Sequence, residues 1–263
     1  MNGTSFHYLT YRGYGKTLQL LGGLSSDYYD YIGVSTYYNT NDTTQALSLE
    51  AEYDRAAGTA TFDTTNRHGI LSASFTGFTE DTSIYQTGVF DQDETNADAV
   101  MCYHQFATTA LQAVTSADTL AVVTEIGFDT DSSDQITNAG LTEAAKLLFD
   151  YDSPSEFTYV AYGTGTTAFA KTQTALVTQV ERKVANNIEL TSTDVYNDTL
   201  RYTVKFTATT AEKVISEVAV FNAATGGDML MRKVMNPTIT VPSGKIPVIV
   251  VDFKICDSSN TPS

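Results

Sequence analysis

The first signal along the chain is a strict alternation of apolar and polar residues in short segments. Residues 71–76 read LSASFT and residues 202–207 read YTVKFT. A two-residue period places every second side chain on one face of a strand, so both segments are predicted to be half-buried strands. Longer apolar runs bounded by turn-forming residues predict further strands at residues 84–91, 122–126, 215–222 and 249–253.

These strand signals recur in the same order in the two halves of the chain, which indicates an internal duplication. A third feature repeats as well, a leucine followed five positions later by an acid and an arginine. It is formed by Leu49 with Asp54-Arg55, and again by Leu176 with Glu181-Arg182. The matched segments are 31–36 with 159–164, 71–76 with 202–207, 84–91 with 215–222, and 116–128 with 243–255.

The duplication predicts two domains, residues 1–128 and 140–263, joined by an acidic linker at residues 129–139. Several short strands joined by turns predict an all-β fold of two tandem β-sandwich, jelly-roll-like domains. Each domain is expected to carry one or two short helices. One helix is expected near Leu20 in the first copy and near Leu147 in the second, and another across residues 44–56 or 172–184.

The apolar alternation also predicts which large side chains form the core. We expect Phe75 and Phe206 to be buried, because they end the two alternating segments. The neighbours Phe90 and Phe221 are expected to be buried too, although adjacent strand residues point to opposite faces and one of each pair could serve an interface. The full set of expected core residues is Phe75, Val89, Phe90, Phe206, Val220 and Phe221.

The net charge limits the classes of partner that the chain is expected to bind. The 263 residues carry 15 Lys+Arg against 31 Asp+Glu, a net charge of −16. A field of this sign repels phosphate backbones, so nucleic-acid binding is not expected. The N-terminal sequence lacks the pattern of a secretory signal and no apolar window reaches membrane-span length, so we expect a soluble protein made in a cytoplasm, with no membrane partner.

No motif predicts a catalytic or cofactor-binding site. The three histidines stand at no metal-ligand or triad spacing, and the segment Gly15-Lys16-Thr17 lacks the earlier glycine of a phosphate-binding loop. Cys102 and Cys256 are too few for a disulfide framework and are interpreted as incidental thiols.

A weak metal signal lies in the linker. Asp129, Asp131 and Asp134 present oxygen atoms at alternating positions, as a calcium loop does. Asp134 stands where the turn glycine of that loop belongs, and no acid occupies the twelfth position. A solvated acidic linker is therefore the favoured interpretation, with a structural calcium site as the alternative.

A cluster of tyrosines is the candidate binding surface. Tyrosine supplies large contact area at little entropic cost, so a protein interface is the favoured interpretation. Sugar stacking and simple core packing are the alternatives. The cluster consists of Tyr28, Tyr29, Tyr31, Tyr37 and Tyr38.

The second half also carries motifs that resemble a known group of proteins. Residues 159–165 (YVAYGTG) form a glycine-threonine turn after a strand, and residues 217–224 (EVAVFNAA) form an acid-led strand before a turn. With Leu176 and Glu181-Arg182, they resemble small β-rich structural proteins of tailed bacterial and archaeal viruses. The first half shows the resemblance more faintly, since residues 88–91 keep GVFD but the acid is lost.

The resemblance implies a virion component without enzymatic activity and without a cofactor, assembled in the host cytoplasm. We expect a capsid-associated decoration or cement protein that binds itself, as a homo-oligomer, and other virion proteins of the capsid, neck or tail. A neck or tail-ring protein is the main alternative, because small β domains recur throughout such particles. A host-glycan-binding module and a hydrolase are further alternatives. The absence of Trp counts against the first, and no carboxylate is singled out for the second.

Overall fold

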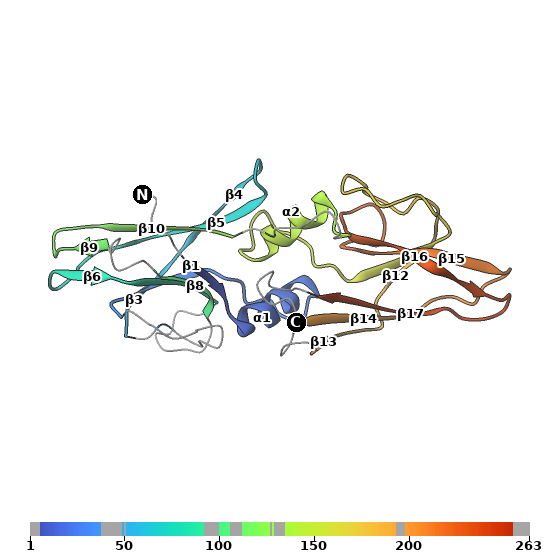
Figure 1. Cartoon of the computed structure of the whole chain (residues 1–263), viewed down its shortest axis with the longest axis horizontal. Coiled ribbons are helices and arrows are strands. Elements are labelled where there is room, and N and C mark those ends of the chain that lie inside the picture. Colours follow the sequence, from blue (N-terminus) through green and yellow to red (C-terminus); the bar gives the residue numbers. More distant parts are fainter. Residues whose placement is uncertain are drawn as a thin grey trace.

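The computed structural model describes residues 6–37, 49, 51–91, 100–105, 112–126, 128, 135–192 and 198–254. The molecule is elongated, with β-sheets toward both ends and two short helices at its centre (Figure 1). These helices are α1 (Tyr11–Leu21) and α2 (Asn138–Leu147). All other regular elements in the described segments are strands, so the predicted all-β class is confirmed.

The described residues of the first half form three antiparallel sheets. The five-stranded sheet has the order β1 (Phe6–Leu9), β8 (Val100–Gln105), β7 (Gln86–Phe90), β2 (Tyr31–Ser35), β3 (Glu52–Ala57). The three-stranded sheet has the order β10 (Leu120–Ile126), β5 (His68–Phe75), β4 (Thr59–Asp63). A small ribbon pairs β6 (Thr82–Ile84) with β9 (Gln112–Val114).

In the second half, the segments that the structure describes form two antiparallel sheets. The four-stranded sheet has the order β12 (Gln179–Val184), β11 (Tyr159–Gly163), β15 (Lys213–Phe221), β16 (Met229–Val241). The three-stranded sheet has the order β13 (Asn187–Thr191), β14 (Thr199–Lys205), β17 (Val248–Lys254). Ile136 forms an isolated bridge with Met231 of β16, at the edge where β1 pairs with β8 in the first half.

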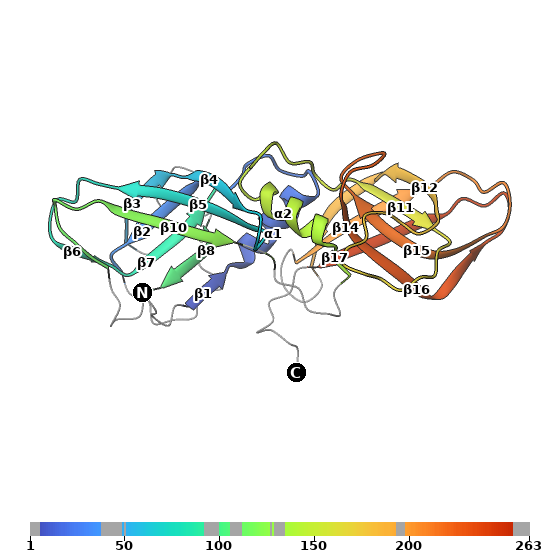
Figure 2. The same cartoon turned by 90° about the horizontal axis from the view of Figure 1, so that it is seen from above.

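The strand orders of the two halves correspond. The order β3-β2-β7-β8 in the first half has the same succession along the chain as β12-β11-β15-β16 in the second. Likewise, β4-β5-β10 corresponds to β13-β14-β17. Figure 2 looks onto the three-stranded sheet of the first half and onto the four-stranded sheet of the second. The outer faces of the two three-stranded sheets therefore turn to opposite sides of the long axis.

Each half has its own buried core, and the alternation seen in the sequence positions it. In β5 every second residue, Leu71, Ala73 and Phe75, is buried, and Tyr202 and Val204 are buried in β14. The core of the second half draws side chains from both of its sheets. All six side chains expected in the cores, Phe75, Val89, Phe90, Phe206, Val220 and Phe221, are buried, which confirms that prediction.

Phe90 and Phe221 are buried on the opposite face of their sheet from their neighbours. Val220 belongs to the main core of the second half, whereas Phe221 belongs to a separate small cluster. The guanidinium of Arg55 lies 3.6 Å from the ring centroid of Phe90, and that of Arg182 lies 3.4 Å from the centroid of Phe221. A stacked arginine therefore covers each phenylalanine, so neither ring is left for an interface.

The predicted second helix is wrong in the described residues. Strand β3 occupies residues 52–57, and turns followed by strand β12 occupy residues 171–184. Both are edge strands whose mixed polar and charged residues suit a solvated helix face equally well. Pairing with β2 and β11 decides the outcome, because tertiary contacts override weak helix propensity.

The helices form the junction between the halves. Thr10 and Thr137 accept hydrogen bonds from the amides of Gly13 and Gly140, each at 2.9 Å, and so cap α1 and α2 in the same way. Helix α1 contacts β8 of its own half and β13 and β14 of the other half. Helix α2 contacts β16 of its own half and β5 of the other. Because α2 begins at Asn138, the end of the expected linker is helical; residues 129–134 lie outside the described segments.

Candidate functional site

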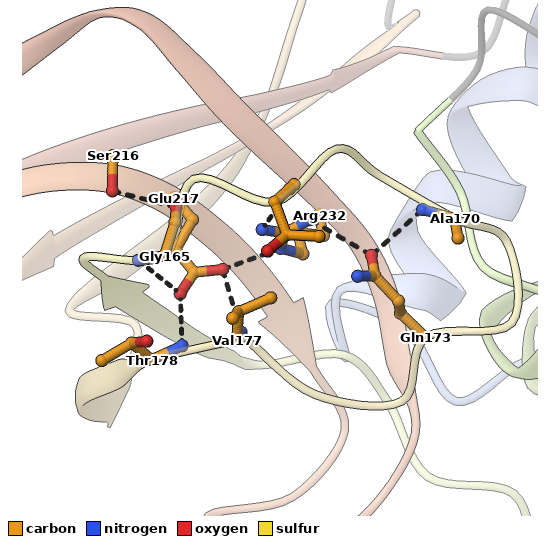
Figure 3. A network of polar contacts seen from close by, with 9 residues as sticks. Gly165, Ala170, Gln173, Val177, Thr178, Ser216, Glu217 and Arg232 are labelled. Atoms are coloured by element: carbon orange, nitrogen blue, oxygen red, sulfur yellow. Dashed lines mark hydrogen bonds and ion pairs between the residues drawn. The ribbon is translucent and has the colours of Figure 1, made fainter.

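A densely hydrogen-bonded polar site in the second half is a buried ion pair between neighbouring strands (Figure 3). Glu217 of β15 and Arg232 of β16 have side chains that are 0 % exposed. The Arg232 Nε donates to Glu217 Oε2 at 2.8 Å. Both side chains project from the outer face of the four-stranded sheet toward the segment that joins β11 to β12.

Backbone groups of that segment, residues 164–178, complete the site. Glu217 accepts hydrogen bonds from the amides of Gly165 at 3.0 Å, Thr178 at 2.7 Å and Val177 at 3.0 Å. Arg232 donates through Nη1 to the side chain of Gln173 at 3.1 Å and through Nη2 to the carbonyl of Thr167 at 2.9 Å. The ion pair therefore fastens this segment to the sheet.

The fastened segment covers apolar surface. Leu176 is buried with Ala161, Phe221 and Met229 in the small cluster on the outer face of the sheet. Gly165 lies so close that a Cβ there would be 2.5 Å from the Glu217 carboxylate. The sheet is thus buried on both faces at this point, one by the main core and one by residues 164–178.

The electrostatics keep Glu217 ionised. Burial acts to raise the pKa of Glu217, but hydrogen bonds from the Thr178 amide, Arg232, and the Val177 and Gly165 amides together hold it below its ordinary value. A carboxylate whose oxygens are engaged by four protein donors positions the backbone. Its chemistry is that of an anchor, not of a proton donor.

No sequence motif predicts this anchor: Glu217 stands only in the segment that carries the viral resemblance, and Arg232 stands in none. One signal was available, a lone acid inside the apolar run of β15, because an acid there must be paired if it is buried. Glu217 lies opposite Gly163, the last residue of β11; in the first half Gln86 lies opposite Ser35, the last residue of β2. A neutral glutamine thus holds the matching place.

The arginine of each repeated acid-arginine sequence donates to the residue three positions before it. The guanidinium of Arg55 donates through Nε and Nη2 to Glu52, each at 2.7 Å, while its backbone amide donates to Asp54 Oδ1 at 2.8 Å. In the second half Arg182 donates to Gln179 at 3.3 and 3.0 Å, not to Glu181. Adjacent strand residues point to opposite faces, so the acid directly before each arginine faces away from it. A β-bulge that skips Tyr53 in β3 and Val180 in β12 shifts the register by one residue, which brings the residue three positions earlier onto the arginine's face.

The structure separates the predicted tyrosine cluster. Tyr29 is buried in the core of the first half and its hydroxyl donates to the carbonyl of Gly13 at 3.4 Å, so its side chain offers no surface to a partner. Tyr28 and Tyr31 are half-buried, and Tyr37 is 46 % exposed. Tyr38 lies outside the described residues, as do Asp129, Asp131 and Asp134. Within the described segments, no group of three His, Cys, Asp or Glu side chains could hold a metal ion.

Exposed apolar side chains lie on several strands, among them Val184 of β12 and Val214 of β15, and the edge strands β10 and β17 carry three of them. Val123 of β10 is 59 % exposed, and Val248 and Val250 of β17 are 59 % and 54 % exposed. Each strand is the outer member of its three-stranded sheet. Val123 faces Ser72 across the ladder, and Val250 faces Thr203, so the two valines hold matching positions in the two halves. We call Val123 and Val250 the outer-face valines.

Comparisons with known proteins add no relative. No family model matches the chain, and no curated protein or solved structure matches it. In the part of the chain that the structure describes, neither helix is long and apolar enough to cross a membrane.

Proposed function

We propose that this chain is a structural protein of a tailed virus particle, a decoration or cement protein built from two duplicated β-sandwich domains. Three repeated features support the duplication: the strand orders, the threonine caps of α1 and α2, and the arginines stacked on Phe90 and Phe221. The motifs in residues 159–165 and 217–224 supply the viral class.

The observation that carries a bridging role is the position of the outer-face valines. They lie at matching places in the two halves, on sheet faces that turn to opposite sides of the molecule (Figures 1 and 2). Apolar side chains on an edge strand are suited to contact with another protein. Two similar surfaces facing apart allow one chain to join two neighbours in a shell.

The mechanism is surface complementarity. Burying one exposed valine against a partner stabilises the contact by about 1.5 kcal/mol or more. Charge does not drive contact between copies, because each chain carries a net charge of −16. Apolar contact has to exceed this repulsion, or the partner surface has to be more basic.

The test is binding of the purified chain to empty particles, before and after placing a charge on this surface. We expect Val123→Asp combined with Val250→Asp to reduce binding at least tenfold, since each aspartate would be desolvated in the contact. The control is Val184→Asp. Val184 is 54 % exposed on β12, on the other type of sheet.

If the control reduces binding as strongly as the double variant does, the effect is one of charge in general, and the assigned surface is contradicted. Full binding by the double variant would contradict the bridging role. Circular dichroism of each variant establishes that the fold is intact.

A further inference from the structure

The junction between the halves is reciprocal at the level of single hydrogen bonds. The amide of Tyr29, two residues before β2, donates to the carbonyl of Leu148 at 2.8 Å. The amide of Phe157, two residues before β11, donates to the carbonyl of Leu21 at 2.7 Å. Leu21 ends α1 and Leu148 directly follows α2. Each half therefore gives one bond and receives one, as subunits related by a two-fold axis do.

The first side-chain contact at this junction places a large residue on a glycine. Phe149, the second residue after α2, is buried against β5 of the first half. A Cβ built at Gly69 of β5 would lie 2.4 Å from two ring carbons of Phe149, closer than atoms can approach. Only a residue without a side chain leaves room for this ring.

In the reciprocal contact the small residue follows the helix and the large side chain lies on the strand. Gly22, directly after α1, lies against the second half, where a Cβ would be 3.0 Å from both terminal carbons of Leu200 in β14 and 3.0 Å from a methyl carbon of Ile188 in β13. Leu200 is the second residue of β14, as Gly69 is of β5. Leu200 pairs with Phe253 at the end of β17, and Gly69 pairs with Ile126 at the end of β10. The ring of Phe149 thus fills one side of the junction, and the side chain of Leu200 fills the other.

We propose that this size exchange makes the junction an interaction surface specific for the opposite half. The face of a first half fits the face of a second half, in the same chain or in a second copy, and does not fit its own kind. Two first-half faces would set Gly22 against Gly69 and leave a void. Two second-half faces would drive Phe149 into Leu200. Copies that exchange halves in an assembly therefore form only first-to-second junctions.

The inference takes from the proposed function only the correspondence of the two halves, and not the viral role. It is tested in the full chain by urea unfolding of four proteins: the wild type, Gly69→Leu, Phe149→Gly and the combined variant. We expect Gly69→Leu to lower the unfolding midpoint in the wild type but to raise it in the Phe149→Gly background. The combined variant recreates the arrangement of Leu200 over Gly22.

A shift of the midpoint that changes sign between the two backgrounds would show that residues 69 and 149 fit against each other. If the strand merely tolerated no larger side chain at position 69, Gly69→Leu would lower the midpoint in both backgrounds. The matched control is Ser74→Leu, an exposed position of the same strand, whose effect should be the same in both backgrounds. The mirror pair Gly22→Phe and Leu200→Gly is expected to show the same reversal on the other side.

A lower midpoint for Gly69→Leu in both backgrounds would overturn the proposal. If Gly69→Leu alone does not fold, the proposal is still tested by comparing the midpoint of Phe149→Gly with that of the combined variant. The same four-protein comparison can also be made with the smaller changes Gly69→Ala and Phe149→Ala. A negative result in this unfolding test would leave the particle-binding test of the proposed function valid, and a negative result in the particle-binding test would leave the unfolding test valid.

Discussion

Two buried polar side chains of the second half show how differently a residue can be accommodated. Glu217 is engaged by four donors, whereas the buried hydroxyl of Tyr202 has no hydrogen-bond partner among the described residues. Burial also raises the pKa of Tyr202, as expected for a phenol surrounded by apolar side chains. The ring of Tyr202 contributes to the core, while its hydroxyl costs stability.

Tyr202→Phe is therefore expected to stabilise the protein. Removing an unpaired buried hydroxyl while keeping the ring should raise the free energy of unfolding by about 1 kcal/mol. The control is Tyr29→Phe, which removes a hydroxyl that does donate a bond and should lower stability. Urea unfolding at neutral pH measures both, and a less stable Tyr202→Phe variant would show that the hydroxyl has a partner.

At the scale of elements, one buried ion pair makes five hydrogen bonds to the segment 164–178. Glu217→Gln removes the charge that compensates the buried guanidinium of Arg232, and is expected to lower the free energy of unfolding by about 3–5 kcal/mol. The control is Asp252→Asn, which breaks the pair with Arg201 on side chains that are 37 % and 41 % exposed. That change should cost less than about 1 kcal/mol. Equal losses in the two variants would contradict the anchoring role.

The same pair predicts a pH dependence. The pKa of Glu217 is lower in the folded protein than its ordinary value of 4.5, so its stabilisation is complete above that value. It is lost as the pH falls through the lower, folded pKa. Wild type should therefore lose more stability between pH 7 and pH 3 than Glu217→Gln does. Parallel pH profiles for the two proteins would show that Glu217 does not contribute in this range.

The elements also show what the sequence could and could not predict. Alternation identified β5 and β14 and their buried faces, because one side of each strand meets a core. It failed for β3 and β12, whose polar residues fit an edge strand and a surface helix equally well. The tyrosine cluster was divided because proximity in sequence does not decide burial: Tyr29 enters the junction, while Tyr37 stays exposed. The two junction contacts, Phe149 against Gly69 and Leu200 against Gly22, join residues far apart in the sequence, so no local pattern predicts them.

At the scale of the whole molecule, a net charge of −16 makes copies of the chain repel one another. Salt screens this repulsion over a length of about 8 Å at physiological ionic strength. Self-association through apolar contacts should therefore persist or strengthen as salt rises, whereas contact with a more basic shell protein should weaken. Sedimentation of the purified chain across a salt series measures the first effect. Complexes of identical chains that dissociate as salt rises would show that ion pairs dominate instead.

The most direct test of the proposed role is a cryo-electron microscopy map of purified particles, into which the two-lobed chain is fitted. We expect one elongated density per chain, with the outer faces of β10 and β17 against two neighbouring shell proteins. A particle that lacks the chain would contradict the structural role. A particle in which both of those faces are turned to solvent would contradict the bridging contact.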